Sequence, residues 1–147
     1  LAYFRRAADL GNAQGQYVVG KKLFGEFRQT PERDRIMAIG MQMLECALAQ
    51  GEAKAGKELG WYFASAGDVS RGLGYFQKAA ALGNTDAIFK LYKVFNEGDF
   101  GVNKDPTRAA CYERLWKESE ADNKKTFPNL DRICPLPPKP VPPAGKA

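Results

Sequence analysis

The chain has 147 residues, of which 44% are hydrophobic and 27% are charged, a balance typical of one globular domain. No run of 18 apolar residues occurs, so the sequence predicts no membrane-spanning helix. Histidine is absent, which removes the commonest general base near neutral pH and a principal zinc ligand. The net charge of +5 is spread along the chain without a dense basic stripe, so we expect no nucleic-acid partner. The modest positive charge favours an acidic protein or an anionic membrane face as the partner.

In chain order, the first feature is a decapeptide that occurs twice. YFRRAADLGN at 3–12 and YFQKAAALGN at 75–84 are identical at seven of ten positions, and MLECALAQGE at 43–52 is a weaker copy. The copies start at residues 3, 43 and 75, so they are 40 and 32 residues apart. The chain begins at Leu1 inside the first predicted helix, without a signal-peptide pattern, so we expect the natural N-terminus and any export signal to precede it.

A second helical pattern follows each copy. These patterns cover residues 13–25, 53–65 and 85–98. Repeats of two helices predict a solenoid, because one pair cannot bury its own apolar face and must stack on the next. Alanine pairs such as Ala79 and Ala80 allow close approach of helices. A glycine is expected to end each decapeptide helix, at Gly11, Gly51 and Gly83.

Helix starts are marked independently by capping residues. The expected N-caps are Asn12, Thr30, Asn84 and Asp105. Pro31 and Pro106 follow two of these caps at the first helical position, where proline is favoured. The glycine-rich segment NEGDFGVNKD at 96–105 predicts the turn that joins the two helices of one repeat.

These patterns resemble the Sel-1-like repeat family, a relative of the tetratricopeptide repeat. The resemblance is clearest in YFQKAAALGNTDAIFKLYKVFNEG at 75–98 and GVNKDPTRAACYERLWKES at 101–119. It implies an all-α, right-handed solenoid of about three and a half helix pairs over residues 1–121. Near the end Trp116 and Lys117 replace the paired alanines, so we expect the last helix to cap the stack.

Residues 122–147 form a separate, proline-rich tail. Seven of the nine prolines lie in the last 20 residues, which predicts an extended segment and excludes a helix from Pro128 onward. We expect the tail to lie across the repeats, and the alternative is a disordered linker or a Pro-rich ligand. The expected anchors are Leu130, Ile133 and Leu136. LDRICPLPPKPVPP also resembles the tail of bacterial Sel-1-like repeat proteins found beside type VI secretion toxins.

Three cysteines occur, Cys46, Cys111 and Cys134, and their spacing contains no CxxC motif. The odd number predicts neither a metal knuckle nor a full disulfide framework. We expect small, partly buried thiols. The alternative is one bridge between Cys111 and Cys134, because the tail has enough slack to fold back on the last helix.

Candidate binding residues follow from the solenoid prediction, in which one helix of each pair lines the curved inner face. Outward positions on the second helices give eight partner-binding candidates: Tyr17, Lys21, Phe24, Lys57, Trp61, Phe89, Lys93 and Asn96. Large aromatics next to cations are typical of interface centres. The alternative places Tyr17, Phe24 and Phe89 in the core. Trp61 fits that alternative least, because Phe63 already fills the packed position.

No catalytic constellation is present. The carboxylates around 97–105 lack calcium-loop spacing, and no G-x-S-x-G motif occurs, so we expect no metal, no cofactor and no enzyme activity. Some cysteine-rich members of the repeat family are linked to β-lactam binding, but they carry two regularly spaced cysteines per repeat, and this chain does not. The sequence therefore predicts a protein-binding module, monomeric when free.

The resemblance of the tail implies a more specific function. It implies an immunity protein that neutralises a cognate type VI secretion toxin, often a phospholipase, by covering its active site. The expected location is the periplasm, or otherwise the cytoplasm. The alternative is a generic scaffold or adaptor in the envelope or cytosol, and the neighbouring gene would distinguish the two: a toxin favours immunity, a transporter or envelope enzyme favours the scaffold.

Overall fold

The computed structural model describes residues 2–9, 11–26 and 32–138. These residues form helices and contain no strand, as the all-α prediction requires. Thr30 and Pro31, which predict a helix start, lie outside the described residues. The helices are α1 (Ala2–Asp9), α2 (Ala13–Glu26), α3 (Arg33–Ala49), α4 (Ala53–Ser65), α5 (Val69–Ala81), α6 (Thr85–Glu97), the 3-10 helix η1 (Asp99–Gly101), α7 (Pro106–Ala121) and α8 (Leu130–Ile133).

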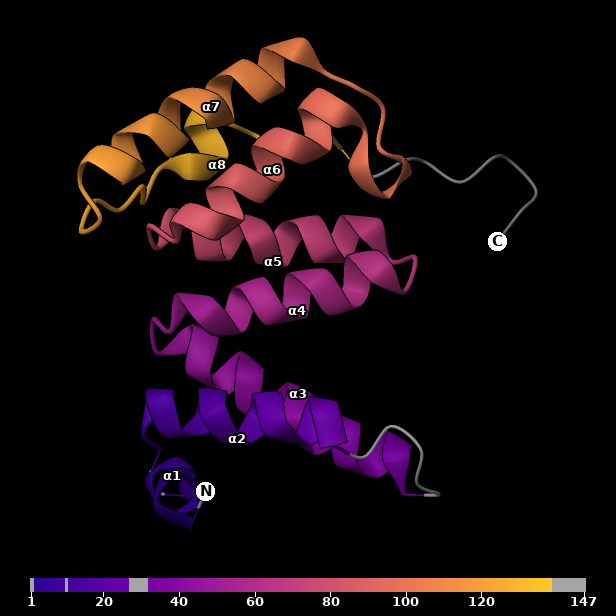
Figure 1. The fold of residues 1–147 in the computed structure, drawn as a ribbon, viewed down its shortest axis with the longest axis vertical. Helices are drawn as coiled ribbons and strands as arrows, with labels where there is room; N and C mark the ends of the chain where they lie inside the picture. The colour runs from indigo at the N-terminus through magenta and orange to yellow at the C-terminus, as the bar shows by residue number, and fades with distance from the viewer. Residues whose placement is uncertain (1, 10, 27–31, 139–147) are drawn as a thin grey trace.

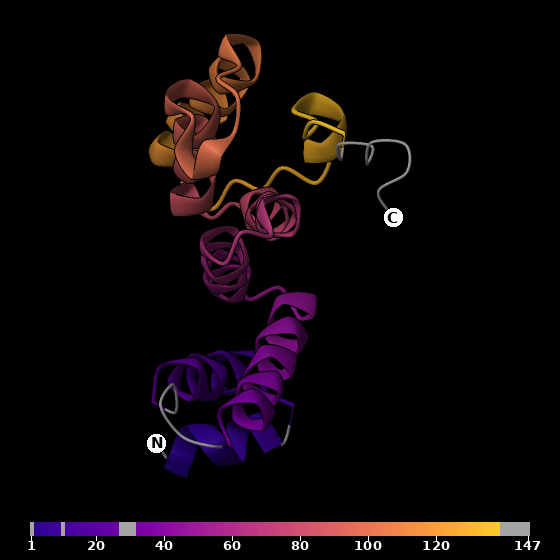
Figure 2. The ribbon, with the colours of Figure 1, turned by 90° about the vertical axis from the view of Figure 1, so that its right-hand side faces the viewer.

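Successive helices stack along the long axis of the protein (Figure 1). The most extensive contacts join α2 to α3, α4 to α5 and α6 to α7, so the second and third decapeptide copies each lie at the end of the second helix of a packed pair. Contacts between pairs are less extensive. In Figure 2, α3 is steeply inclined to α4 and α5, which are seen nearly end-on.

The decapeptide copies end their helices in the same way. Gly11, Gly51 and Gly83 follow α1, α3 and α5 with φ angles of 82°, 93° and 90°, a left-handed conformation that glycine adopts without strain. Ala79 is fully buried, and a Cβ atom added to Gly56 of α4 would lie 3.0 Å from the Cβ atom of Ala79. The expectation that small residues allow close helix approach is confirmed at this contact.

Three of the four expected N-caps are described, and all three form. The side chains of Asn12 and Asn84 each accept a hydrogen bond at 2.9 Å from the backbone amide three residues later, and Asp105 accepts one from Arg108 at 3.0 Å. The backbone amide and guanidinium of Arg108 lower the pKa of Asp105. Pro106 then occupies the start of α7, as predicted.

The buried side chains form two clusters. The N-terminal cluster contains Tyr17, Leu44, Ala47, Leu48, Ala55, Leu59, Phe63 and Tyr75. The C-terminal cluster is larger and contains Ala64, Leu73, Phe76, Ala79, Ala80, Ala87, Ile88, Leu91, Val94, Phe95, Ala109, Tyr112, Leu115, Phe127, Leu130 and Cys134. The second cluster therefore includes residues of the tail.

The tail returns to the stack, but not as a fully extended segment. The backbone amide of Phe127 donates to the carbonyl of Ala81 at 2.8 Å, and the chain crosses α5 before forming α8 (Figure 2). The exclusion of helix was wrong here, because NLDRI at 129–133 contains no proline and can close one turn. Residues 139–147 lie outside the described part of the chain.

Two of the three expected anchors hold the tail. Leu130 is only 1% exposed, and Leu136 packs against the C-terminal cluster. Ile133 is 43% exposed, so its assignment as an anchor was wrong. The one-turn helix places Leu130 in the C-terminal cluster, whereas the side chain of Ile133, three residues later, is exposed.

A disulfide joins Cys111 of α7 to Cys134, whereas Cys46 is a free, exposed thiol. The preferred expectation of small, partly buried thiols was therefore wrong: Cys111 and Cys134 form the alternative pair, and Cys46 is exposed. Around the bridge, the buried hydroxyl of Tyr112 donates to Gln77 Oε1 at 2.7 Å, and Gln77 Nε2 donates to the carbonyl of Cys134 at 2.9 Å. Burial raises the pKa of Tyr112.

Candidate protein-binding face

The candidate residues lie on α2, α4 and α6, here called the α2–α4–α6 face, but they are not equally available. Tyr17 is 8% exposed and belongs to the N-terminal cluster, so the alternative that placed it in the core is the observed one. The side chain of Phe24 lies outside the described residues. The available part of the face therefore begins with Lys21, whose ammonium lies 5.8 Å from the centre of the Tyr17 ring.

Ion pairs join neighbouring helices across this face. Lys21 Nζ lies 3.2 Å from Glu58 Oε1, which joins α2 to α4. The hydrogen bond to Glu58 raises the pKa of Lys21. Lys57 Nζ lies 3.2 Å from Asp86 Oδ2, which joins α4 to α6. Because these pairs are partly exposed, each contributes about 1 kcal/mol or less, and a partner carboxylate can exchange with them.

Among the described side chains of this face, Trp61 is the most exposed large aromatic, at 44%. Its ring packs edge-on against Phe76, with ring centres 6.0 Å apart, and against Phe100 at 5.6 Å. Phe63 is buried, as predicted when Trp61 was assigned to the surface. Trp61 is thus held in one orientation by the core while nearly half of it remains open to a partner.

Lys90 and Phe100 complete the surroundings of Trp61. Lys90 Nζ lies 4.5 Å from the centre of the Trp61 ring and 4.7 Å from that of Phe100, and it pairs with Asp99 at 2.7 Å. Cation–π contacts of this kind orient the ring further. Phe100 adopts a φ of 58°, which is strained for a residue with a Cβ atom and is typical of functional sites.

Sequence reasoning did not select Lys90 or Phe100. The available signal was the segment NEGDFG at 96–101, where one aromatic residue stands among glycines that permit an unusual turn. Nothing in the helical periodicity indicates that this turn folds back toward α4. The contact depends on the tertiary placement of η1 beside Trp61.

A second aromatic group covers the seam between α6 and α7. The ring centres of Phe89 and Trp116 lie 4.7 Å apart, and the Tyr92 ring stacks on Trp116 at 6.1 Å. All three side chains are half-buried. Phe89 is therefore packed on one side and exposed on the other, and Trp116 contributes to the same half-exposed aromatic surface.

The last two candidates lie beside this aromatic seam. Lys93 Nζ is 5.8 Å from the centre of the Phe89 ring and 3.6 Å from Glu97 Oε2. Asn96 is exposed on the same helix. The α4–α6 part of the face thus combines half-exposed aromatics with lysines that are already paired.

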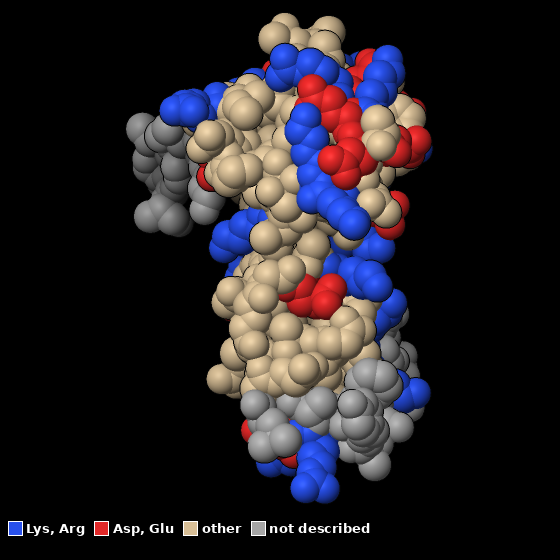
Figure 3. Space-filling view, turned by 90° about the vertical axis from the view of Figure 1, so that its left-hand side faces the viewer, with Lys and Arg blue, Asp and Glu red and all other residues tan. Residues whose placement is uncertain are grey.

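The face combines half-exposed aromatic rings with charged side chains, a composition typical of protein-binding surfaces. On the side drawn in Figure 3, acidic and basic side chains are mixed at the upper end, so neither sign of charge dominates there. Within the described residues, no group of three or more His, Cys, Asp or Glu side chains could hold a metal ion. None of the described helices has the length and apolar character needed to cross a membrane.

Comparison with known proteins gives matches among solved structures. No protein-family model matches the chain, and no curated protein matches it significantly. Immunity protein Pa5087 from Pseudomonas aeruginosa is 29% identical, with a TM-score of 0.78 over 95% of this chain. Immunity protein PA5088 from the same organism is 28% identical, with a TM-score of 0.80 over 94%. A third structure, Pseudomonas aeruginosa 5086, is 29% identical, with a TM-score of 0.79 over 94%.

The chain covers 52%, 52% and 53% of these three structures, so it spans about half of their length. Within that span the likeness includes nearly all of this chain, and it supports the resemblance to immunity proteins that the tail suggested.

Proposed function

We propose that this protein is an immunity protein that binds and neutralises a cognate toxin secreted by a type VI system. The observation that carries the proposal is the structural similarity to two immunity proteins over 94–95% of the chain, at 28–29% identity. The helix pairs and their recurring glycine ends favour a Sel-1-like solenoid as the scaffold. The tail sequence favours a phospholipase as the toxin.

The proposed location is the periplasm. Disulfides persist in oxidising compartments and are rare in the reducing cytosol. The bridge between Cys111 and Cys134 fastens the tail to α7, so the fold described here uses an oxidised pair. A periplasmic inhibitor would also meet an incoming phospholipase before it reaches the membrane.

Binding would use the α4–α6 part of the α2–α4–α6 face. Trp61 is the proposed anchor, because a large aromatic side chain that is already oriented loses little conformational entropy on binding. Phe89, Tyr92 and Trp116 add apolar surface on the adjoining seam. Inhibition then requires the face to cover the mouth of the toxin active site, and this protein supplies no catalytic group of its own.

The test first searches the genes beside this one for a phospholipase-type toxin and then uses that toxin. Co-expression of this protein in the periplasm should restore growth of cells that produce the toxin there, and purified toxin should bind it in surface plasmon resonance. Trp61→Ala should weaken binding by about 2 kcal/mol, roughly 30-fold, mainly through faster dissociation. Ile39→Ala is the matched control, because Ile39 is also 44% exposed but lies on α3.

Three results would contradict parts of this proposal. Binding that is equally strong for Trp61→Ala and the parent would move the interface elsewhere. Failure to protect cells or to bind the toxin, with stable association to an envelope complex instead, would favour the scaffold alternative. Phospholipid hydrolysis that persists in the purified protein through a second purification would contradict the absence of enzyme activity.

A further inference from the structure

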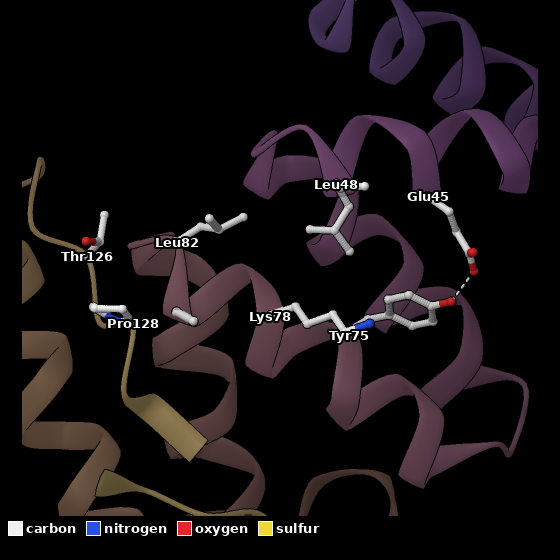
Figure 4. Close-up of a pocket in the computed structure, with 9 residues that line it drawn as sticks. Glu45, Leu48, Tyr75, Lys78, Leu82, Thr126 and Pro128 are labelled. Carbon is white, nitrogen blue, oxygen red and sulfur yellow. Dashed lines mark hydrogen bonds between the residues drawn. The ribbon is translucent and has the colours of Figure 1, made fainter. Parts of the chain in front are cut away.

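A largely apolar groove lies on the other helices of the stack, between α3 and α5 (Figure 4). It has a volume of about 630 Å³. Leu48 of α3 forms one wall, Leu82 at the end of α5 lies across from it, and Pro128 of the returning tail closes one end. Leu82 is 39% exposed, so its side chain is open to a bound group.

The groove is held open by the core beneath it. The side chain of Phe127 is buried in the C-terminal cluster, and its backbone amide is bonded to Ala81, so the tail wall is fixed at residues 126–128. Gly83 lies so close to this wall that an added Cβ atom would collide with the carbonyl oxygen of Lys125. The wall therefore does not depend on a bound ligand for its position.

The polar residues in the groove leave one uncompensated positive charge. The carboxylate of Glu45 accepts a hydrogen bond from Tyr75 and lies 3.9 Å from Arg71, so its charge is already compensated. Lys78 is exposed on α5, with Nζ 5.6 Å from the centre of the Tyr75 ring, and it pairs with no carboxylate of the described residues. A bound group that carries a negative charge would complement it.

The depression continues beyond Lys78 along α5. A second hollow of about 260 Å³ shares Lys78, Ala81 and Pro128 with the first and extends to Leu136. The α5 residues that line the two hollows run from Gly74 to Ala81, about two turns of the helix. Two adjoining hollows along one helix can accommodate successive apolar anchors of one peptide segment, as hydrophobic grooves that bind an amphipathic helix do.

We propose that this α3–α5 groove docks an acidic, apolar-faced segment of a protein partner. The segment would place apolar side chains against Leu48 and Leu82 and a carboxylate on Lys78. This site is separate from the α2–α4–α6 face and would give the protein a second point of contact. It does not require the partner to be a toxin, so it can be tested independently of the proposed function.

The test selects random 12-residue peptides displayed on phage against the full chain, then titrates the synthetic peptides by fluorescence polarisation. The selected peptides should carry Asp or Glu close to two large apolar residues. Leu82→Asp and Lys78→Glu should each weaken their binding at least 10-fold, and Lys78→Arg should retain it. Ile39→Asp is the control, because Ile39 is exposed on α3 and lines neither hollow.

Several results would overturn the proposal. One is the absence of enriched peptides, and another is undiminished peptide binding by Leu82→Asp or Lys78→Glu with an unchanged circular dichroism spectrum. Saturable binding of dodecanoate without any selected peptide would assign the groove to a small anionic amphiphile instead. Dimerisation of the parent that Leu82→Asp abolishes, seen by sedimentation, would assign it to a second copy of the chain.

Discussion

The two halves of the stack use the same repeated decapeptide but are stabilised differently. In the N-terminal half, small residues bring helices together: a Cβ atom added to Gly20 of α2 would lie 2.9 Å from the carbonyl oxygen of Gly40 in α3. In the C-terminal half, a disulfide, a buried hydrogen-bond network and the returning tail surround Tyr112. The repeat thus determines how helices pair, while residues outside the repeat determine how the stack is completed.

The same contrast applies to the binding face. Tyr17, Lys57 and Phe89 stand at equivalent positions of successive repeats, counted from the glycines that end the decapeptides. Tyr17 is buried, Lys57 forms an ion pair with Asp86, and Phe89 packs on Trp116. Equivalent positions therefore share a helix face but not a role, because the neighbouring helices differ.

The largest expected effect compares one leucine from each half. Leu91 and Leu44 are both fully buried. Leu91→Ala should lower the free energy of unfolding by about 3–5 kcal/mol, because the rings and the disulfide around the C-terminal cluster restrict its collapse into the cavity. Leu44→Ala should cost about 2–3 kcal/mol, since the smaller cluster can relax more. Urea unfolding followed by circular dichroism measures both, and a larger loss for Leu44→Ala would reverse the comparison.

The next effect removes the disulfide that distinguishes the C-terminal half. The double substitution Cys111→Ala with Cys134→Ala opens a loop whose ends are 23 residues apart, and it should lower stability by about 2–4 kcal/mol. Thermal unfolding of this variant is compared with that of Cys46→Ala, which removes the free, exposed thiol and should change little. Equal melting temperatures for the two variants would mean that the hydrogen bonds and Leu130 hold the tail unaided.

Much of the fold could be predicted from the sequence because it depends on local chemistry. The glycines at helix ends, the caps at Asn84 and Asp105, and the alanine contacts act within one or two turns of the chain. The tail could not be predicted to the same extent. Whether Cys134 reaches Cys111, and which of Leu130 and Ile133 faces inward, depends on how α5 and α7 come together.

The candidate face was predictable only in part for the same reason. The exposure of Trp61 followed from the position of Phe63 within one helix. The contact with Phe100 follows from the left-handed turn after α6, and the contribution of Trp116 follows from the packing of α7 on α6. Helical periodicity describes one helix at a time and carries no information on these neighbours.

A smaller effect tests the close contact between α4 and α5, where the two halves meet. A Cβ atom added to Gly72 would lie 2.6 Å from the backbone nitrogen of Ala64, whereas one added to Gly74 would meet nothing within 4 Å. Gly72→Ala should therefore cost about 1–3 kcal/mol through overpacking. Gly74→Ala should stabilise the same helix by up to about 1 kcal/mol. Equal urea midpoints for the two variants would mean that α4 and α5 separate freely.

The smallest expected effect concerns the hydroxyl of Tyr112. Tyr112→Phe removes the donor to Gln77 Oε1 and should cost about 1–2 kcal/mol at pH 8, whereas Tyr92→Phe removes a hydroxyl without a hydrogen bond to any described residue.

Burial raises the pKa of Tyr112, so the folded protein holds this proton more tightly than the unfolded chain. The parent's free energy of unfolding should then be unaffected by this group below roughly pH 10 and fall as the pH rises further. Tyr75, whose pKa burial also raises, adds a decline of the same sign, so Tyr112→Phe should reduce the slope without abolishing it. Urea unfolding at pH 8 and pH 11 measures both slopes, and an identical slope in Tyr112→Phe and the parent would contradict a buried, protonated Tyr112.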